Sequence, residues 1–561
     1  MSSYPNTQET VSPTSNKPRA EELIQRYEQV LSGRRQFESY WQSLHDYFYV
    51  EAQDINKSYS PGNELDASCL WDSSTLEAPD VFASGFMNYL TPPTSKWFKL
   101  RHQNPKLQEN KAVAKFFDDV TEAVNSTINR SNFYDQMFPS YKSSGVFGTT
   151  TLFLEEDPYE DVRFYNMPLK QVAIVEDGRG RVCAYFIEFE YTANQAASRW
   201  GKENLSRELQ EEIQQGKGDT KKHKFLLFIG QRFAREVQKE DKKNLPIEAL
   251  WIEVAAKSIV EESGYHEFPA MCHRFDKRPF IPWGYSPAMK ALPFARILNA
   301  IAKTNLRSMM KHTDPPIAVP DNAFLMPFNQ NPRAINYYRK DAMPDGKSIF
   351  PFGNFGDPNA GLQAVAFYQQ EVKRLMFNDI FLAFNQITKE MNNPEVAERI
   401  NEKMTMLGPA VGRYLSEVLN PVVHRIIGIL QRKGSLPEAP REIVDNPFYE
   451  VDFVGQLAQA QRRTELNTLV TGLTMIGQMA QFNPEVMDKV DPDKVADEVW
   501  AITGAPVKVL RDDAEIQKIR EGRAEAALKQ QQMMTLESGA RMAKDAGNAA
   551  AGFSKAKETN K

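Results

Sequence analysis

The sequence predicts an α+β fold built in several parts, with antiparallel strands in its first half and helices in its second half. The chain has 561 residues, several times the usual length of one domain. Hydrophobic residues make up 41% and charged residues 25%, which is the balance of an ordinary folded protein. Segments rich in β-branched and aromatic residues follow one another between residues 145 and 259 without alternating with helices, which favours antiparallel sheets over a doubly wound fold.

The N-terminal region predicts a mobile arm followed by three helices. Residues 1–18 are rich in Ser, Thr, Pro and Asn and have few apolar side chains to bury, so burial cannot offset the entropy lost on ordering. From residue 19 apolar side chains recur every three to four positions, which predicts a long helical segment with a break near Ser32 and Gly33. A second helix is expected to start after the capping residues 72–75 and to end before Pro92, and a third to span about 110–128.

The following region predicts strands. Residues 145–155 and 162–174 carry Phe, Val, Thr and Ile between turn residues. Residues 172–175 and 182–189 flank the turn 177–180, which indicates a hairpin. The sheet is expected to continue through residues 224–232 and 249–259.

Residues 286–312 predict a long helix with one basic face. The helix contains no acidic residue, and at about 100° per residue four cations fall on one narrow stripe. These cations are Arg296, Lys303, Arg307 and Lys311. The stripe can pair with acidic residues of a neighbouring subunit or with water, or it can contact phosphate directly. The first interpretation is favoured, because charged helix faces are usually solvated or paired.

The second half continues with a small insert and then helices. Residues 313–361 contain many prolines and short apolar runs, so only short strands and turns are expected there. A helix is predicted over 362–386, then a polar break over 387–393, then a long helix over 394–440. Residues 441–513 are helical in pattern. The tail, 514–561, has few large apolar anchors and needs neighbouring chains to become ordered.

Catalytic motifs are absent from the sequence. It has no GxxxxGK[ST], HExxH or GxSxG pattern, and its three cysteines form no CxxC pair. We therefore expect no catalytic residue, no cofactor and no metal site. Clustered carboxylates at 155–161 leave one alternative open, a metal-dependent enzyme that processes nucleic acid. Histidines flanking Cys272 are more typical of a structural role than of a metal site.

Charge and hydropathy limit the possible partners. No run of about 18 apolar residues is present, so no membrane partner is expected, and the start of the chain lacks a secretory signal. Net charge is −5, from 68 basic and 73 acidic residues. Proteins that grip DNA usually carry a basic excess. If this protein meets DNA, it is not built to hold it.

Several short motifs, in order along residues 20–440, resemble the podovirus-type head-to-tail connector, or portal, family of short-tailed phages. Trp71-Asp-Ser-Ser-Thr75 precedes a helix that ends in Leu90-Thr-Pro-Pro93, and Trp97-Phe98 follows. Further matching stretches occupy 148–156, 164–180, 395–409 and 434–437. Residues 391–394, Met-Asn-Asn-Pro, depart from the family pattern, in which Thr and Ala precede Glu-Val.

The resemblance implies a ring of twelve subunits at one capsid vertex, through which the genome is packaged and ejected. It implies a wing over 19–285, stem helices over 286–312 and 362–386, a clip over 313–361, and a crown over 441–513. The segment 394–440 would return to the wing, and 514–561 would form a helical tail or barrel. A channel loop over 387–393 would face the DNA with Thr388, Lys389, Glu390, Asn392 and Asn393.

The same resemblance implies the partners and the location. Double-stranded DNA would pass through the ring, and the terminase motor and the tail adaptor proteins would dock on it. Major capsid and scaffold proteins would surround it in the virion, after assembly in the host cytoplasm. A structural head protein that forms no ring is the remaining alternative.

Overall fold

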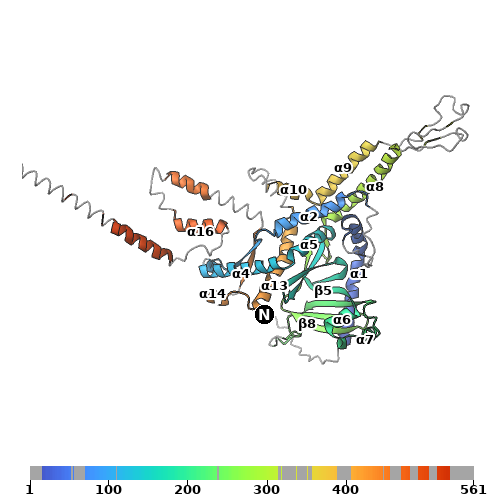
Figure 1. Ribbon diagram of the computed structural model, residues 1–561, viewed down its shortest axis with the longest axis horizontal. Coiled ribbons are helices and arrows are strands. Elements are labelled where there is room, and N and C mark those ends of the chain that lie inside the picture. The colour runs from blue at the N-terminus through green and yellow to red at the C-terminus, as the bar shows by residue number, and fades with distance from the viewer. Residues whose placement is uncertain are drawn as a thin grey trace, which may run out of the picture. The chain divides into compact units, whose positions relative to one another are not determined.

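The computed structural model describes residues 16–51, 55, 70–108, 110–236, 239, 241–313, 317–318, 337, 350–351, 357–387, 406–445, 448–454, 469–479, 490–503, 515–530, 533 and 542. Figure 1 shows the chain coloured by residue number. The chain divides into two compact units. The first unit comprises residues 1–101, 119–439 and 448–461, and the second comprises 102–118, 440–447 and 462–561. The predicted mobile arm lies almost entirely outside the described residues.

A five-stranded antiparallel meander is the largest sheet of the first unit. Each strand pairs with the next one along the chain, so the sheet needs no crossover connection. The strands are β4 (Val172–Glu176), β5 (Val182–Thr192), β6 (Lys222–Gln231), β7 (Ile247–Glu253) and β8 (Ser258–Tyr265). The predicted preference for antiparallel strands is confirmed.

The turn between β4 and β5 is the one predicted from the sequence. The Asp177 carboxylate accepts hydrogen bonds from the backbone N–H groups of Arg179 and Arg181, at 2.9 and 2.8 Å. Gly180 has a φ of 74°, a left-handed value that glycine adopts readily. The strand expected over 249–259 is instead divided between β7 and β8, because the chain turns at Lys257, where φ is 51°.

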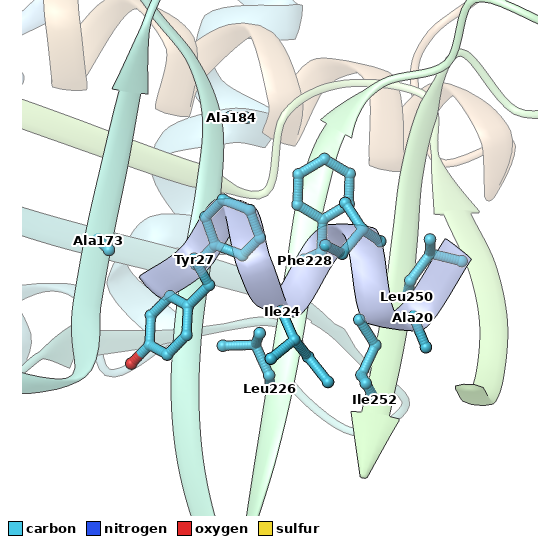
Figure 2. Packing of buried hydrophobic residues seen from close by; sticks show 11 residues of the cluster. Ala20, Ile24, Tyr27, Ala173, Ala184, Leu226, Phe228, Leu250 and Ile252 are labelled. Carbon is cyan, nitrogen blue, oxygen red and sulfur yellow. The ribbon is translucent and has the colours of Figure 1, made fainter. Parts of the chain in front are cut away.

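Helix α1 (Asn16–Phe48) crosses one face of this sheet. Figure 2 shows its apolar side chains over the strands. The buried cluster joins Ala20, Leu23, Ile24 and Tyr27 to Ala173, Ala184, Phe186, Leu226, Phe228, Leu250 and Ile252. The break predicted at Ser32 and Gly33 is wrong. Ser32 Oγ donates to the carbonyl of Gln29 within the helix, and Gly33 faces open space, so neither residue disturbs the helix.

The opposite face of the sheet is covered by α6 (Ala193–Trp200) and carries an aromatic cluster. The Trp200 ring lies 4.9 Å from Phe225 and 5.1 Å from Trp251, measured between centroids. A capping box formed by Thr192 and Gln195 starts α6. Helix α7 (Arg207–Gln214) follows. Burial on both faces explains why every residue of β7 is buried.

A three-stranded sheet lies in the same unit, in the order β3 (Asp161–Met167), β2 (Thr149–Asp157), β9 (Ala270–Arg274). Before it stands α5 (Phe133–Phe147), a helix that the sequence analysis missed. The strand predicted from residue 145 therefore begins only at 149. Gly148 makes the change of direction, with a φ of 77° and the carbonyl oxygen of Gly284 packed against it.

Two further predicted helices are present. They are α2 (Ser74–Leu90), which leads to Thr91, and α4 (Lys111–Arg130). Strand β1 (Phe98–His102) pairs with β14 (Tyr449–Phe453), and Trp97 beside it is fully buried. A short hairpin joins β10 (Asp276–Lys277) to β11 (Gly284–Tyr285).

The predicted helix 286–312 is α8 (Pro287–Thr313), whereas the helix predicted over 362–386 is two helices. They are α9 (Pro358–Leu375) and α10 (Asn378–Ile387). The chain breaks between them at Phe377, whose φ of 60° is left-handed. Of the insert between α8 and α9, the described part includes β12 (Ile317–Ala318) paired antiparallel with β13 (Phe350–Pro351).

The helix predicted over 394–440 ends earlier than expected. Its described part consists of α12 (Gly408–Tyr414), a π-helical turn (Leu415–Leu419) and α13 (Asn420–Arg432). Gly434 ends it with a φ of 66°, and the N–H of Ser435 bonds to the carbonyl of Leu430.

In the second unit the described segments are mainly helical. They include α3 (Pro105–Gln108), α14 (Arg441–Asp445), α16 (Pro492–Thr503) and helical residues 469–479 and 515–530. Arg520 pairs with Asp493 at 2.6 Å. Most of the predicted tail or barrel beyond 530 lies outside the described residues. In the part of the chain that the structure describes, no helix has the length and apolar character needed to cross a membrane.

The contact between α2 and α10 yields a stability test. A Cβ atom on Gly85 would lie 2.1 Å from Cγ of Phe381, so Gly85→Ala should lower the free energy of unfolding by about 1–3 kcal/mol through overpacking. Gly33→Ala is the matched control, because a Cβ there meets nothing within 4 Å and should stabilise by roughly 0.4–1 kcal/mol. Denaturation midpoints of both variants provide the measurement. Equal midpoints would contradict this packing.

Candidate functional site: a long helix pair and its base

Helices α8 and α9 form an antiparallel pair that extends away from the sheets (Figure 1). Asn305 of α8 lies against Gly361 of α9, and Phe294 lies 6.2 Å from Tyr368 between ring centroids. A Cβ at Gly361 would come within 2.2 Å of Asn305 Oδ1, so glycine allows the two helices to approach closely. The pairing places the first turn of α9 beside the last turns of α8.

The start of α8 is fixed to the body of the unit. Ser286 Oγ accepts a hydrogen bond from the N–H of Met289 at 3.0 Å, which caps the helix, and Pro287 occupies its first turn. The same hydroxyl donates to the carbonyl of Val146 at 2.6 Å. The helix therefore leaves the body in a defined direction.

The four predicted stripe residues all lie on α8, but their surroundings differ. Arg296 donates to Ser43 Oγ of α1 at 2.9 Å, and Nζ of Lys303 lies 5.2 Å from the centre of the Trp71 ring. Arg307 and Lys311 are exposed toward the far end of the helix. The structure thus brings Arg296 and Lys303 against other parts of the same subunit at the base of the helix.

Several apolar side chains of the pair are also exposed. On α8 and α9 these are Ile297, Leu306, Met309, Met310, Leu362 and Phe367. Large apolar groups left in water on two adjacent helices indicate a surface that another protein covers.

The segment before α2 clamps the two long helices together, which the sequence analysis did not foresee. The N–H of Trp71 donates to Oδ1 of Asn299 on α8 at 2.6 Å. Gln369 of α9 donates from Nε2 to Oδ2 of Asp72 at 2.6 Å. Trp71 is 43% exposed, so it covers the base of α8 without entering the core.

Helix α2 provides the platform under α9 and α10. Phe381 of α10 packs against Gly85 and meets Phe82 and Phe86 at 5.8 and 5.7 Å between ring centroids. An ion pair of 3.8 Å joins Lys373 of α9 to Glu77 of α2. These contacts fix α9 and α10 on α2.

The helix on the other side of the undescribed stretch is also fixed. Tyr414 of α12 shares a 2.9 Å hydrogen bond with Ser140 of α5. In the π-helical turn, Glu417 accepts from the N–H of Arg274 at 2.9 Å and from its guanidinium at 2.6 Å. That guanidinium also pairs with Glu176. The predicted channel-loop residues Thr388, Lys389, Glu390, Asn392 and Asn393 lie outside the described residues, between these two anchored helices.

The carboxylates at 155–161 lie on the hairpin between β2 and β3, where most of them have structural partners. Glu156 pairs with Arg432 at 3.1 Å, and Asp161 pairs with Lys433 at 2.9 Å. Among the residues that the structure describes, no group of three His, Cys, Asp or Glu side chains is arranged to hold a metal ion. The exposed acidic loop is thus explained by ion pairs to α13 and its C-terminal end.

Cys272 and its neighbouring histidines do not form a common site. Cys272 and His273 are buried, whereas His266 is exposed. Burial raises the pKa of the Cys272 thiol to about 12. The His273 ring packs 4.4 Å from Tyr414, centroid to centroid, and burial holds its pKa well below the ordinary value.

Comparisons with known proteins match most of the chain, including this helix pair. A family model described as "Bacteriophage head to tail connecting protein" matches residues 20–510. The portal protein of Salmonella phage epsilon15 is 28% identical over 533 residues, which cover 93% of this chain and 94% of that protein. The probable portal protein of Bordetella phage BPP-1 is 29% identical over 529 residues, covering 92% and 93%.

Among solved structures, a chain from the virion of the native gene transfer agent particle matches with a TM-score of 0.27 and 11% identity. The match covers 56% of this chain and 68% of that chain. At this score the likeness supports no inference.

The burial of neutral His273 predicts a dependence of stability on pH. Its folded-state pKa lies well below that of an unfolded chain, about 6.5. As pH falls below that value the unfolded chain binds a proton that the folded protein does not, so stability should fall by at most about 1.4 kcal/mol per pH unit. His273→Phe should show a shallower loss between pH 7 and 5 in denaturation curves. Exposed His266→Gln is the control, and equal slopes in wild type and His273→Phe would contradict the assignment.

Proposed function

We propose how this chain works from one premise: it belongs to the bacteriophage head to tail connecting protein family, and it is a portal protein. A portal protein is a structural component of the phage virion, located at the junction of head and tail. Its family implies a ring oligomer. The assignment of parts, the number of copies and the partners are our proposals.

The ring consists of twelve copies at one capsid vertex and serves as the conduit for packaging and ejection of double-stranded DNA. The sheets and helices within 19–285 form the wing, and α8 with α9 forms the stem. The insert 313–361 forms the clip, the stretch after α10 forms the channel loop, and 394–440 returns to the wing. Residues 441–513 form the crown, and 514–561 form a helical tail or barrel.

The antiparallel pair α8–α9 is the observation that supports this function best. It is long and clamped at its base by Trp71 and Asp72, and it carries apolar side chains that the described part of the chain leaves exposed. Equivalent pairs from neighbouring copies would cover these side chains and surround a central channel. A monomeric role would leave the same side chains in water.

A conduit has to let a stiff polyanion slide. Binding to DNA comes largely from phosphates neutralised by Lys and Arg, and this chain carries a net charge of −5. Two cations of the stripe already have contacts within the subunit: Arg296 donates a hydrogen bond to Ser43, and Lys303 lies over the Trp71 ring. Because charged helix faces are usually paired or solvated, we assign the stripe, including Arg307 and Lys311, to pairing with acidic side chains or to water rather than to DNA phosphate.

The channel loop would contact the moving DNA with Thr388, Lys389, Glu390, Asn392 and Asn393. Support comes from the described helices on either side of residues 388–405, because Phe381 packs α10 against α2 and Glu417 anchors the helical segment after residue 406. The terminase motor and later the tail adaptor proteins would dock on the clip, and major capsid and scaffold proteins would surround the wing.

No specific observation favours the metal-dependent enzyme. The carboxylates at 156 and 161 are engaged with Arg432 and Lys433, as an ordinary surface loop would be. The exposed apolar side chains of the helix pair favour contact with neighbouring copies, so they do not support a head protein that forms no ring.

If Arg307 and Lys311 do not bind phosphate, removing their charges should not change the affinity for DNA. The double variant Arg307→Gln with Lys311→Gln should leave the affinity of purified rings for double-stranded DNA, and its dependence on salt, unchanged. Fluorescence anisotropy over a salt series provides the measurement. A slope of log affinity against log salt that falls by about one per lost contact would show that these side chains hold phosphate.

The clip assignment predicts a separation of assembly from docking. Replacing residues 316–358 by a short glycine-serine linker should preserve rings in negative-stain images, because the α8–α9 packing at Asn305 and Gly361 remains. The same variant should fail to package DNA with its terminase motor in an in vitro assay. Normal packaging by rings of this variant would contradict the assignment.

A further inference from the structure

Two turns at opposite ends of β2 each present an exposed aromatic side chain. Phe280, in the loop between β10 and β11, is fully exposed. Tyr159, in the turn between β2 and β3, is 95% exposed. Isolated exposed apolar residues are common on proteins. These two differ because each stands on a fixed turn that also carries several charged side chains.

The loop that carries Phe280 is held in place. Trp283 at its end is buried and meets Trp41 edge to face, with 5.0 Å between centroids. The Arg278 guanidinium lies 3.6 Å from the centre of the Tyr285 ring. Phe280 itself has a φ of 62°, a left-handed value that bulky residues rarely adopt. The strained backbone at Phe280 is not offset by burial of its side chain within the subunit. This combination indicates that a partner covers the side chain.

Positive charge gathers beside this loop. Nζ of Lys277 donates to the carbonyl of Gly180, so the β4–β5 turn lies next to the β10–β11 hairpin. That turn contributes Arg179 and Arg181, which join Arg278. All three arginines are exposed. Backbone hydrogen bonds and the charges of Arg179 and Arg181 lower the pKa of Asp177 on the same turn, so these two arginines share one carboxylate there.

Negative charge lies at the other end of β2. The Asp157 carboxylate accepts hydrogen bonds from the N–H groups of Tyr159 and Glu160, at 2.7 and 2.9 Å. These hydrogen bonds lower the pKa of Asp157, and the charges of Arg163 and Lys433 lower it further, so the group is charged at neutral pH. Glu160 forms no ion pair among the residues that the structure describes. Tyr159 thus stands between two carboxylates at the tip of the turn.

The two turns are separated by the length of β2. Gly284, at the base of the Phe280 loop, donates to Oγ1 of Thr149 at the first residue of the strand, whereas Asp157 is its last. Nine residues span roughly 26 Å at about 3.3 Å per residue. A closed ring of identical copies is joined by heterologous contacts, in which two different surfaces of each copy meet. Surfaces at opposite ends of one strand, with opposite charge, satisfy that requirement.

We propose that the Phe280 loop of one copy packs against the Tyr159 turn of the next copy, with Arg179, Arg181 and Arg278 facing Asp157 and Glu160. Aromatic residues and arginine are the types most enriched where protein interfaces gain their binding energy. This inference rests on the proposed ring and names one contact within it.

Cysteine cross-linking tests the contact in full-length rings. Chains with Phe280→Cys and chains with Tyr159→Cys are assembled together and oxidised. They should give covalent dimers, whereas each variant assembled alone should give none. One chain carrying both changes should give a ladder of linked subunits. A link within a chain is excluded, because a disulfide needs its Cα atoms within about 7 Å.

The possible outcomes separate the contact from the ring itself. Wild-type rings without cross-linked dimers in the mixture would overturn this contact and leave the portal function intact. Dimers from Phe280→Cys alone would show a contact between like surfaces and would also overturn it. Absence of any ring in wild type would overturn both the contact and the proposed function.

Alanine substitution gives a second readout that does not depend on disulfide geometry. Phe280→Ala should lower the yield of assembled rings by about tenfold at limiting protein concentration, measured by mass photometry. Phe233→Ala is the matched control, because Phe233 is 89% exposed on another loop and should assemble like wild type. Equal yields for the two variants would contradict a contribution of Phe280 to assembly.

Discussion

Close packing of α9 and α10 on α2 is the constraint on which the rest of the structure depends. Phe381 fits against Gly85 because no Cβ stands in its way, and Glu77 holds α9 from the same helix. This platform supports the long pair α8–α9 where it leaves the body. Glu417 and Tyr414 anchor the helical segment after residue 406 to Arg274 and Ser140 of the same unit.

The distribution of charge suits a channel through which DNA slides, and not a protein that binds DNA tightly. The carboxylates 156 and 161 are used in ion pairs to α13 and its end, and Arg296 and Lys303 are engaged at the base of the stem. Exposed charged side chains also lie beside the Phe280 loop and on the Tyr159 turn. In the proposed contact these charges join neighbouring copies and do not bind DNA.

Local pattern predicted much of the fold, since the β4–β5 hairpin, the antiparallel sheets and the basic face of α8 follow from turn residues and periodicity. Local pattern failed at α5, whose aromatic, Ser and Gly residues are poor helix formers that tertiary packing overrides. It also failed at Phe377, because an apolar residue gave no sign of a break. The clamp of Trp71 and Asp72 on α8 and α9 joins residues more than 200 positions apart, which no window of sequence contains.

We infer that identical copies surround a hole, with α8 and α9 of each copy forming its wall. Electron cryomicroscopy of the assembled full-length protein can test this arrangement. We expect an annular particle in which these helices encircle the central channel and the apolar side chains of one pair lie against the next copy. A stable single copy under all assembly conditions, or rings in which α8 and α9 lie away from the channel, would contradict it.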